Sequence, residues 1–148
     1  MNDHSRQNFV IVAGPNGAGK STVAEFLMLN KNIYTYLNAD IIAKGMAAQS
    51  RVGSDITAGR VLLEEIHVSL NRRESIAFES TMSGTSWKTV LKRAQDTGYD
   101  TTICYIAVSS AEISIERVRR RVLEGGHDIP EDTLRRRFDR SIKNFMTS

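Results

Sequence analysis

The strongest chemical signal in this sequence is the run Gly14-Pro15-Asn16-Gly17-Ala18-Gly19-Lys20-Ser21, which matches the pattern G-x-x-x-x-G-K-[ST]. A loop of this kind turns its backbone N–H groups toward a polyphosphate, and the start of the next helix adds its positive dipole end. We expect Lys20 to reach the β- and γ-phosphates of ATP or GTP, and Ser21 to bind Mg²⁺. A glycine turn that only joins a strand to a helix is the alternative. The predicted nucleotide-binding residues are Gly14, Pro15, Asn16, Gly17, Ala18, Gly19, Lys20, Ser21 and Thr22.

Two acidic residues follow apolar runs and could assist phosphoryl transfer. Asp40 is predicted to bind the substrate and to accept the proton of its hydroxyl, and the alternative is a helix N-cap. Glu79 is predicted to hold Mg²⁺ through water or to position the substrate, and the alternative is simple solvent exposure. The hydroxyls of Thr81 and Ser83 are predicted to hydrogen-bond the substrate, whereas side-chain alternation along a strand places Ser80 elsewhere.

Arginines are concentrated in the last quarter of the chain, where we predict catalytic roles for Arg121 and Arg137. Planar guanidinium groups can stabilise the charge that develops during phosphoryl transfer. Arg117 shares a helix face with Arg121, and Arg140 shares one with Arg137. The intervening Gly125-Gly126 turn is predicted to act as a lid hinge that brings both pairs over the phosphates. Solvated or ion-paired side chains are the alternative for each arginine.

The elements that must position these residues alternate between strand and helix. Short apolar runs predict strands at 9–13, 33–39, 75–78 and 101–108, and helical periodicity predicts helices at 21–29, 56–70, 86–94, 112–123 and 131–145. Such alternation indicates parallel strands joined by crossovers. The predicted fold is therefore a three-layer α/β P-loop NTPase, nucleoside-kinase-like, with a parallel sheet of four to five strands and a helical C-terminal lid region.

Composition limits the class of protein. The chain has 148 residues, 41% of them hydrophobic and 25% charged, which predicts one globular domain over residues 1–148. No apolar run approaches the roughly 20 residues of a membrane helix, and the single cysteine cannot form an internal disulfide. We expect a cytoplasmic protein with no membrane partner. Nucleic acid is not expected either, because acidic residues interleave with the C-terminal arginines.

Taken together, the motifs resemble the zeta-toxin family of small P-loop kinases over nearly the whole chain. The matching segments are the phosphate loop, Leu37-Asn38-Ala39-Asp40, Phe78-Glu79-Ser80-Thr81-Met82-Ser83-Gly84, Gly125-Gly126-His127-Asp128-Ile129-Pro130 and Arg135-Arg136-Arg137-Phe138. The resemblance implies ATP and Mg²⁺ as cofactors and a small hydroxyl compound as substrate. It points to the nucleotide sugar UDP-N-acetylglucosamine in particular, with an inhibitory antitoxin protein as a partner.

The sequence departs from that family at its C-terminus. Family members run on after the last helix into a further strand with an acidic-Asn element, whereas this sequence stops at Ser148. Two alternatives follow from this comparison, a naturally short protein or one that has lost its final strand, and the choice between ATP and GTP stays open. A nucleotide-binding or regulatory ATPase module without efficient transfer is the alternative function.

Overall fold

The computed structural model describes residues 6–39, 41, 42, 54–126 and 128–147. Its centre is a four-stranded sheet of β1 (Asn8–Ala13), β2 (Thr35–Leu37), β3 (Ile76–Ser80) and β4 (Asp100–Tyr105). The strands are parallel and lie in the order β2-β3-β1-β4. The central strand β1 is an apolar run with Phe9 to Ala13 fully buried, as expected of a strand covered on both faces.

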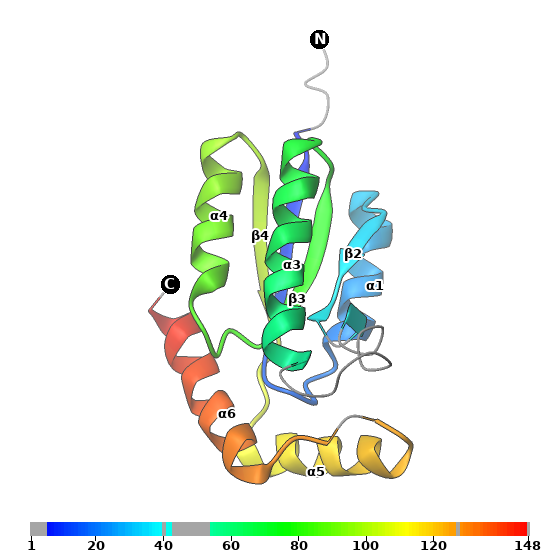
Figure 1. Ribbon diagram of the computed structural model, residues 1–148, viewed down its shortest axis with the longest axis vertical. Helices are drawn as coiled ribbons and strands as arrows, with labels where there is room; N and C mark the ends of the chain where they lie inside the picture. The colour runs from blue at the N-terminus through cyan, green and yellow to red at the C-terminus, as the bar shows by residue number, and fades with distance from the viewer. Residues whose placement is uncertain (1–5, 40, 43–53, 127, 148) are drawn as a thin grey trace.

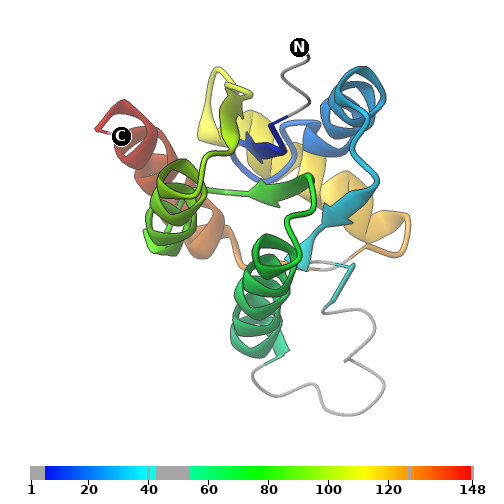
Figure 2. The same ribbon diagram turned by 90° about the horizontal axis from the view of Figure 1, so that it is seen from above.

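Helices cover both faces of the sheet, which gives three layers (Figures 1 and 2). The helix α1 (Lys20–Lys31) packs on one face, where Val10 and Val12 of β1 meet Ala24. The helices α3 (Ser54–Asn71) and α4 (Ser86–Asp96) pack on the other face. There the alternate residues of β1, Phe9 and Ile11, form a larger core with side chains of both helices. This alternation within one strand supplies both cores.

Two further helices, α5 (Ala111–Leu123) and α6 (Glu131–Met146), complete the chain. In Figure 1, α5 lies across the carboxyl ends of the strands and α6 runs back toward α4. Leu134 of α6 packs on Ile115 and Val118 of α5 in a third core. Near its other end, α6 is held to β4 because the rings of Tyr105 and Phe145 stack with centroids 4.3 Å apart.

The predicted fold class is confirmed. The structure has the parallel α/β sheet, the helices on both faces and the two C-terminal helices. Element bounds differ mainly at strand ends, since β2 is three residues long and β4 ends at Tyr105. Among the described residues, none of the helices is long and apolar enough to cross a membrane.

Candidate functional site

The glycine-rich loop lies between the end of β1 and the start of α1, as its sequence predicts. Gly14 has a φ of 150°, and a Cβ atom there would lie 2.5 Å from the carbonyl oxygen of Ile106. Gly17 has a φ of 79°, and a Cβ there would lie 2.9 Å from Cβ of Arg117. Both positions therefore require glycine, for backbone conformation and for space. The loop is further tied to β3 by a 3.2 Å hydrogen bond from the Gly14 N–H to the Ser80 carbonyl.

Lys20, the first residue of α1, folds its side chain back over this loop. Its ammonium group donates hydrogen bonds to the carbonyl oxygens of Gly14 at 2.8 Å and Pro15 at 3.1 Å. The loop therefore holds a cation beside the backbone N–H groups at the helix start. That combination forms an anion-binding corner.

A polar cluster beside the loop joins residues from three elements. The hydroxyl of Ser21 donates a 3.0 Å hydrogen bond to Oε1 of Glu79, at the end of β3. The amide of Asn38, just after β2, donates to Oε2 of the same carboxylate. Burial raises the pKa of Tyr36, and the hydrogen bond to Glu79 and the negative charge of that carboxylate raise it further. Tyr36 therefore stays protonated at neutral pH and can act as a donor toward Glu79.

Glu79 and Asn38 of this cluster line a cavity of about 330 Å³ at the carboxyl end of the sheet. Open α/β sheets bind their ligands at this edge. One part of the lining is polar and belongs to the phosphate loop and strand ends, and another is formed by α3, α4 and the loop after β3. The described lining residues are Asn16, Lys20, Asn38, Ala39, Ala58, Gly59, Leu62, Glu79, Ser80, Thr81, Ser83, Gly84, Ser86, Trp87, Ile129 and Arg137.

The hydroxyl-rich loop after β3 forms one side of this cavity. The hydroxyls of Thr81 and Ser83 lie 2.8 Å apart and hydrogen-bond to each other. Ser80 lines the cavity too, and its Oγ accepts a 3.0 Å hydrogen bond from the Met82 N–H. Strand alternation does not keep Ser80 away from the cavity, because β3 ends at Ser80; its exclusion from substrate binding stays a prediction.

The two predicted arginines lie in different places. Arg137 of α6 is half-buried and lines the cavity. Arg121 of α5 is exposed and is not among the described lining residues, so the structure does not bring it to the cavity. A neighbour one helical turn earlier, Arg117, instead donates a 3.0 Å hydrogen bond to the carbonyl oxygen of Gly17 in the phosphate loop. Because Ser114 of the same helix face donates to the Asn16 carbonyl, this face of α5 rests on the phosphate loop.

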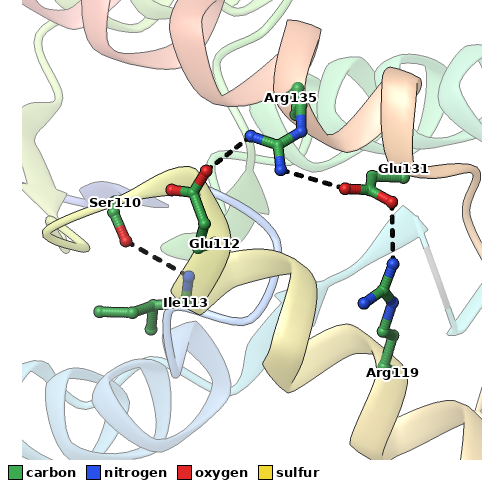
Figure 3. Close-up of polar contacts among 6 residues, drawn as sticks. All are labelled: Ser110, Glu112, Ile113, Arg119, Glu131 and Arg135. Atoms are coloured by element: carbon green, nitrogen blue, oxygen red, sulfur yellow. Dashed lines mark hydrogen bonds and ion pairs between the residues drawn. The ribbon is translucent and has the colours of Figure 1, made fainter.

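Other C-terminal arginines form ion pairs, as the alternative interpretation predicted. Arg135 of α6 donates to Glu112 of α5 at 2.7 Å and to Glu131 at 3.0 Å, and Arg119 donates to Glu131 at 2.8 Å (Figure 3). The hydrogen bond from Arg135 is the main cause that lowers the pKa of Glu112. This exposed network joins α5 to α6 at two points.

The Gly125-Gly126 turn ends α5 in a hydrogen-bonded cap. The Gly125 N–H donates to the Val122 carbonyl at 3.0 Å, and the Gly126 N–H donates to the Arg121 carbonyl at 2.6 Å. This pattern, with Gly125 at a φ of 94°, is a Schellman motif. The glycines thus have a structural role at the helix end, and the lid hinge stays a prediction.

A family model described as an AAA domain matches residues 9–145. The chain belongs to this AAA-domain family. A Haemophilus influenzae relative of uncharacterised function is 32% identical over 130 residues, covering 87% of this chain and 91% of the relative.

Three solved structures show which fold this AAA-domain protein shares. A chain of the Pnkp1/Rnl/Hen1 RNA repair complex superposes with a TM-score of 0.75 at 16% identity over 99% of this chain, which spans only 48% of that longer chain. A candidate kinase from Chloroflexus aurantiacus has a TM-score of 0.70 at 18% identity, covering 88% of this chain and 79% of its own. Shikimate kinase from Acinetobacter baumannii has a TM-score of 0.59 at 18% identity, covering 97% of this chain and 80% of its own. The AAA-domain protein therefore has a P-loop kinase-like fold.

The described residues fit a bound nucleoside triphosphate with Mg²⁺. Asn16 lines the cavity. Its side-chain oxygen Oδ1 is buried and has no hydrogen-bond partner in the described part of the chain. Ser21 and Glu79 are oxygen ligands of the kind that Mg²⁺ prefers. The residues that the structure describes contain no cluster of three or more His, Cys, Asp or Glu that could hold a metal. Glu79 is a carboxylate in the described part of this cluster, and Mg²⁺ takes much of its remaining coordination from water and phosphates.

Sequence reasoning missed Asn38 and Tyr36 as site residues, although Asn38 was inside a quoted motif. Arg117 was predicted to act together with Arg121, one helical turn away, and the structure brings Arg117 to the Gly17 carbonyl of the phosphate loop. Asp40, the predicted proton acceptor, lies outside the described residues. Its role stays a prediction.

Proposed function

We propose that this protein transfers the γ-phosphoryl group of ATP or GTP to a hydroxyl of a small molecule. The observation that carries the proposal is the lining of a single cavity. Lys20 and Asn16 of the phosphate loop lie on one side of it, and the hydroxyls of Thr81 and Ser83 lie on another. A donor nucleotide and a hydroxyl acceptor could therefore meet there, as in-line transfer requires.

Each described residue of the cluster has a part in this reaction. Mg²⁺, when bound, neutralises negative charge on the phosphates. Ser21 and Glu79 would hold it, the carboxylate either directly or through water, and Asn38 keeps Glu79 oriented. Lys20 would place its ammonium on the β- and γ-phosphates once it leaves the loop carbonyls that it now contacts.

The acceptor side needs a proton acceptor and cations. We propose that the carboxylate of Asp40 accepts the proton of the attacking hydroxyl. Arg137, on the cavity wall, would stabilise charge on the transferred group, and Arg121 would join it only if α5 turned toward the cavity. Thr81 and Ser83 would hydrogen-bond the acceptor.

The resemblance to zeta toxins makes UDP-N-acetylglucosamine the first acceptor of this proposal, with an inhibitory antitoxin as a partner and the cytoplasm as the location. The cavity of about 330 Å³ lies at the small end of ligand sites and would take the sugar part of such a molecule. A Sinorhizobium meliloti gluconokinase also shares the fold, with a TM-score of 0.56 at 18% identity over 91% of this chain and 74% of its own. Together with the shikimate kinase, it makes small hydroxy acids suitable as comparison acceptors.

The test is a coupled assay of ADP release from ATP, with and without Mg²⁺, in the presence of UDP-N-acetylglucosamine, shikimate or gluconate. We expect one acceptor to stimulate release and to yield a phosphorylated product by mass spectrometry. Lys20→Ala should abolish the signal, whereas Lys92→Ala, which removes an exposed lysine paired with Asp96 on α4, should leave it unchanged. Nucleotide binding without stimulated release by any acceptor would instead support a module without efficient transfer.

A further inference from the structure

The loop after β3 has an uncommon backbone conformation at its centre. Met82 adopts a φ of 56° although it is not glycine, and its side chain is only 1% exposed. A left-handed conformation at a bulky residue is unfavourable and persists only where the surroundings hold it. On either side of it, Thr81 and Ser83 form the hydroxyl pair that lines the cavity. The conformation of Met82 therefore decides where these hydroxyls lie.

One side chain from the far end of the chain holds this loop. The amide of Asn144, on α6, donates hydrogen bonds to the carbonyl oxygens of Met82 at 2.6 Å and Gly84 at 3.0 Å. Both bonds come from the same Nδ2 atom and span the turn. Removing them would leave the half-buried Met82 carbonyl without this donor, and a polar group left unsatisfied in such a setting destabilises the loop.

A second donor meets the same carbonyl. The indole N–H of Trp87 donates to the Gly84 carbonyl at 3.0 Å, and this residue, the only tryptophan in the chain, is 4% exposed. Trp87 also lines the cavity. Its fluorescence therefore reports directly on the loop that Asn144 holds, whether or not the protein is turning over substrate.

The helix that carries Asn144 is itself fixed. Phe145 stacks on Tyr105 of β4, and the Tyr105 hydroxyl hydrogen-bonds Ser141 at 2.8 Å. Arg137 lies seven residues before Asn144, which is two helical turns and hence the same side of α6. One anchored helix thus supplies the cavity with a guanidinium group and also sets the shape of its hydroxyl loop.

We propose that Asn144 is a positioning residue for the acceptor site: it holds the loop 81–84 in the conformation that presents Thr81 and Ser83 to a hydroxyl-bearing acceptor. The inference rests on the proposed kinase function. Asn144 acts through the loop and does not touch the nucleotide side of the cavity, whose described residues belong to the phosphate loop and strand ends. Its loss should therefore affect the acceptor selectively.

The experiment compares Asn144→Asp, which keeps the size of the side chain but removes the donor, with Asn144→Gln, which keeps the amide. Lys143→Ala, at the adjacent exposed position, is the control. Acrylamide quenching of Trp87 fluorescence should increase at least about twofold in the Asp variant, less in the Gln variant and not in the control. Unchanged quenching in the Asp variant would overturn the proposal without reference to activity.

Kinetics on the same proteins use UDP-N-acetylglucosamine, shikimate and gluconate as acceptors. In Asn144→Asp we expect the KM for the acceptor to rise about tenfold while the KM for ATP stays within twofold, with partial recovery in Asn144→Gln. Equal changes in both KM values would show a general structural role and overturn the proposal. If the wild-type protein transfers to none of these acceptors, the proposed kinase function and the acceptor role fail together, and the quenching result still decides whether Asn144 holds the loop.

Discussion

The hydroxyl of Ser21 donates a 3.0 Å hydrogen bond to the carboxylate of Glu79, which lies 58 positions further along the chain. The contact exists because β1 and β3 are neighbouring parallel strands that end side by side, with Val12 opposite Glu79 in the register. Ser21, in the first turn of α1, and Glu79, near the end of β3, are thereby brought to the same edge of the sheet. This pair is the structural centre of the proposed Mg²⁺ site.

Replacing Glu79 by Gln should lower Mg²⁺-dependent transfer by about 100-fold or more, because the amide keeps the shape of the side chain but loses the charge that holds the cation. The measurement is kcat at saturating ATP over a range of Mg²⁺ concentrations. Glu65→Gln, at an exposed position of α3, is the matched control and should behave as wild type. Wild-type activity in Glu79→Gln would remove this residue from the site.

Replacing Arg117 by Met should weaken nucleotide binding roughly 3- to 10-fold, since the hydrogen bond to the Gly17 carbonyl holds α5 against the phosphate loop. Calorimetric titration with a non-hydrolysable ATP analogue measures the effect. Arg120→Met is the comparison, because Arg120 pairs with Glu116 on its own helix at 2.9 Å and does not reach the loop. Equal losses in both variants would point to net charge as the cause.

Replacing Gly14 by Ala should destabilise the fold by about 2 kcal/mol or more, because the new methyl group would lie 2.5 Å from the Ile106 carbonyl and the φ of 150° disfavours an L-residue. Gly59→Ala is the opposite case. It lies inside α3 with no atom within 4 Å of the added carbon, so alanine should stabilise by up to about 1 kcal/mol. Urea unfolding of both variants gives the two free energies, and a neutral Gly14→Ala would contradict the packing described for the loop.

The ion pair between Glu112 and Arg135 should make the melting temperature of the protein depend on pH in the acid range. The pKa of Glu112 in the folded protein lies below its ordinary value of 4.5, so the pair stabilises the fold above that pH and the contribution is lost as the pH falls below it. Glu112→Gln should therefore lower the melting temperature at pH 7 more than at pH 3. Glu116→Gln, which removes an ion pair within one helix, is the control variant, and an equal loss at pH 7 and pH 3 in Glu112→Gln would contradict the prediction.

Much of the fold could be predicted because its determinants are local. The run Phe9 to Ala13 is apolar at every position, which a strand buried on both faces requires, and the glycine loop directly follows it. The helix α4 ends at Asp96, just before Gly98, which has a φ of 88° of the kind that glycine favours at a helix end. Strand bounds were less accurate at β2, where Ile33 packs into a core without joining the sheet.

The positions of candidate site residues were predictable mainly where a local element fixes them. Lys20 and Ser21 are positioned by the loop that contains them, and Glu79 by the strand it nearly ends. The choice between Arg117 and Arg121 depends instead on the rotation of α5 against the phosphate loop, because residues four apart share a face but lie one turn apart along the axis. The rotation of α5 is set by its packing against the phosphate loop, which is far from it in the sequence.

The sequence by itself therefore determined the strand-loop-helix unit that would bind phosphate and the order of strands and helices around it, because periodicity and glycine chemistry act between near neighbours. Only the tertiary structure decided that Asn38 meets Glu79, that Arg117 rests on Gly17, and that Asn144 holds the loop at Met82. Each of these contacts joins segments far apart in the chain. Their geometry depends on how helices and strand ends pack, for which no local pattern in the sequence exists.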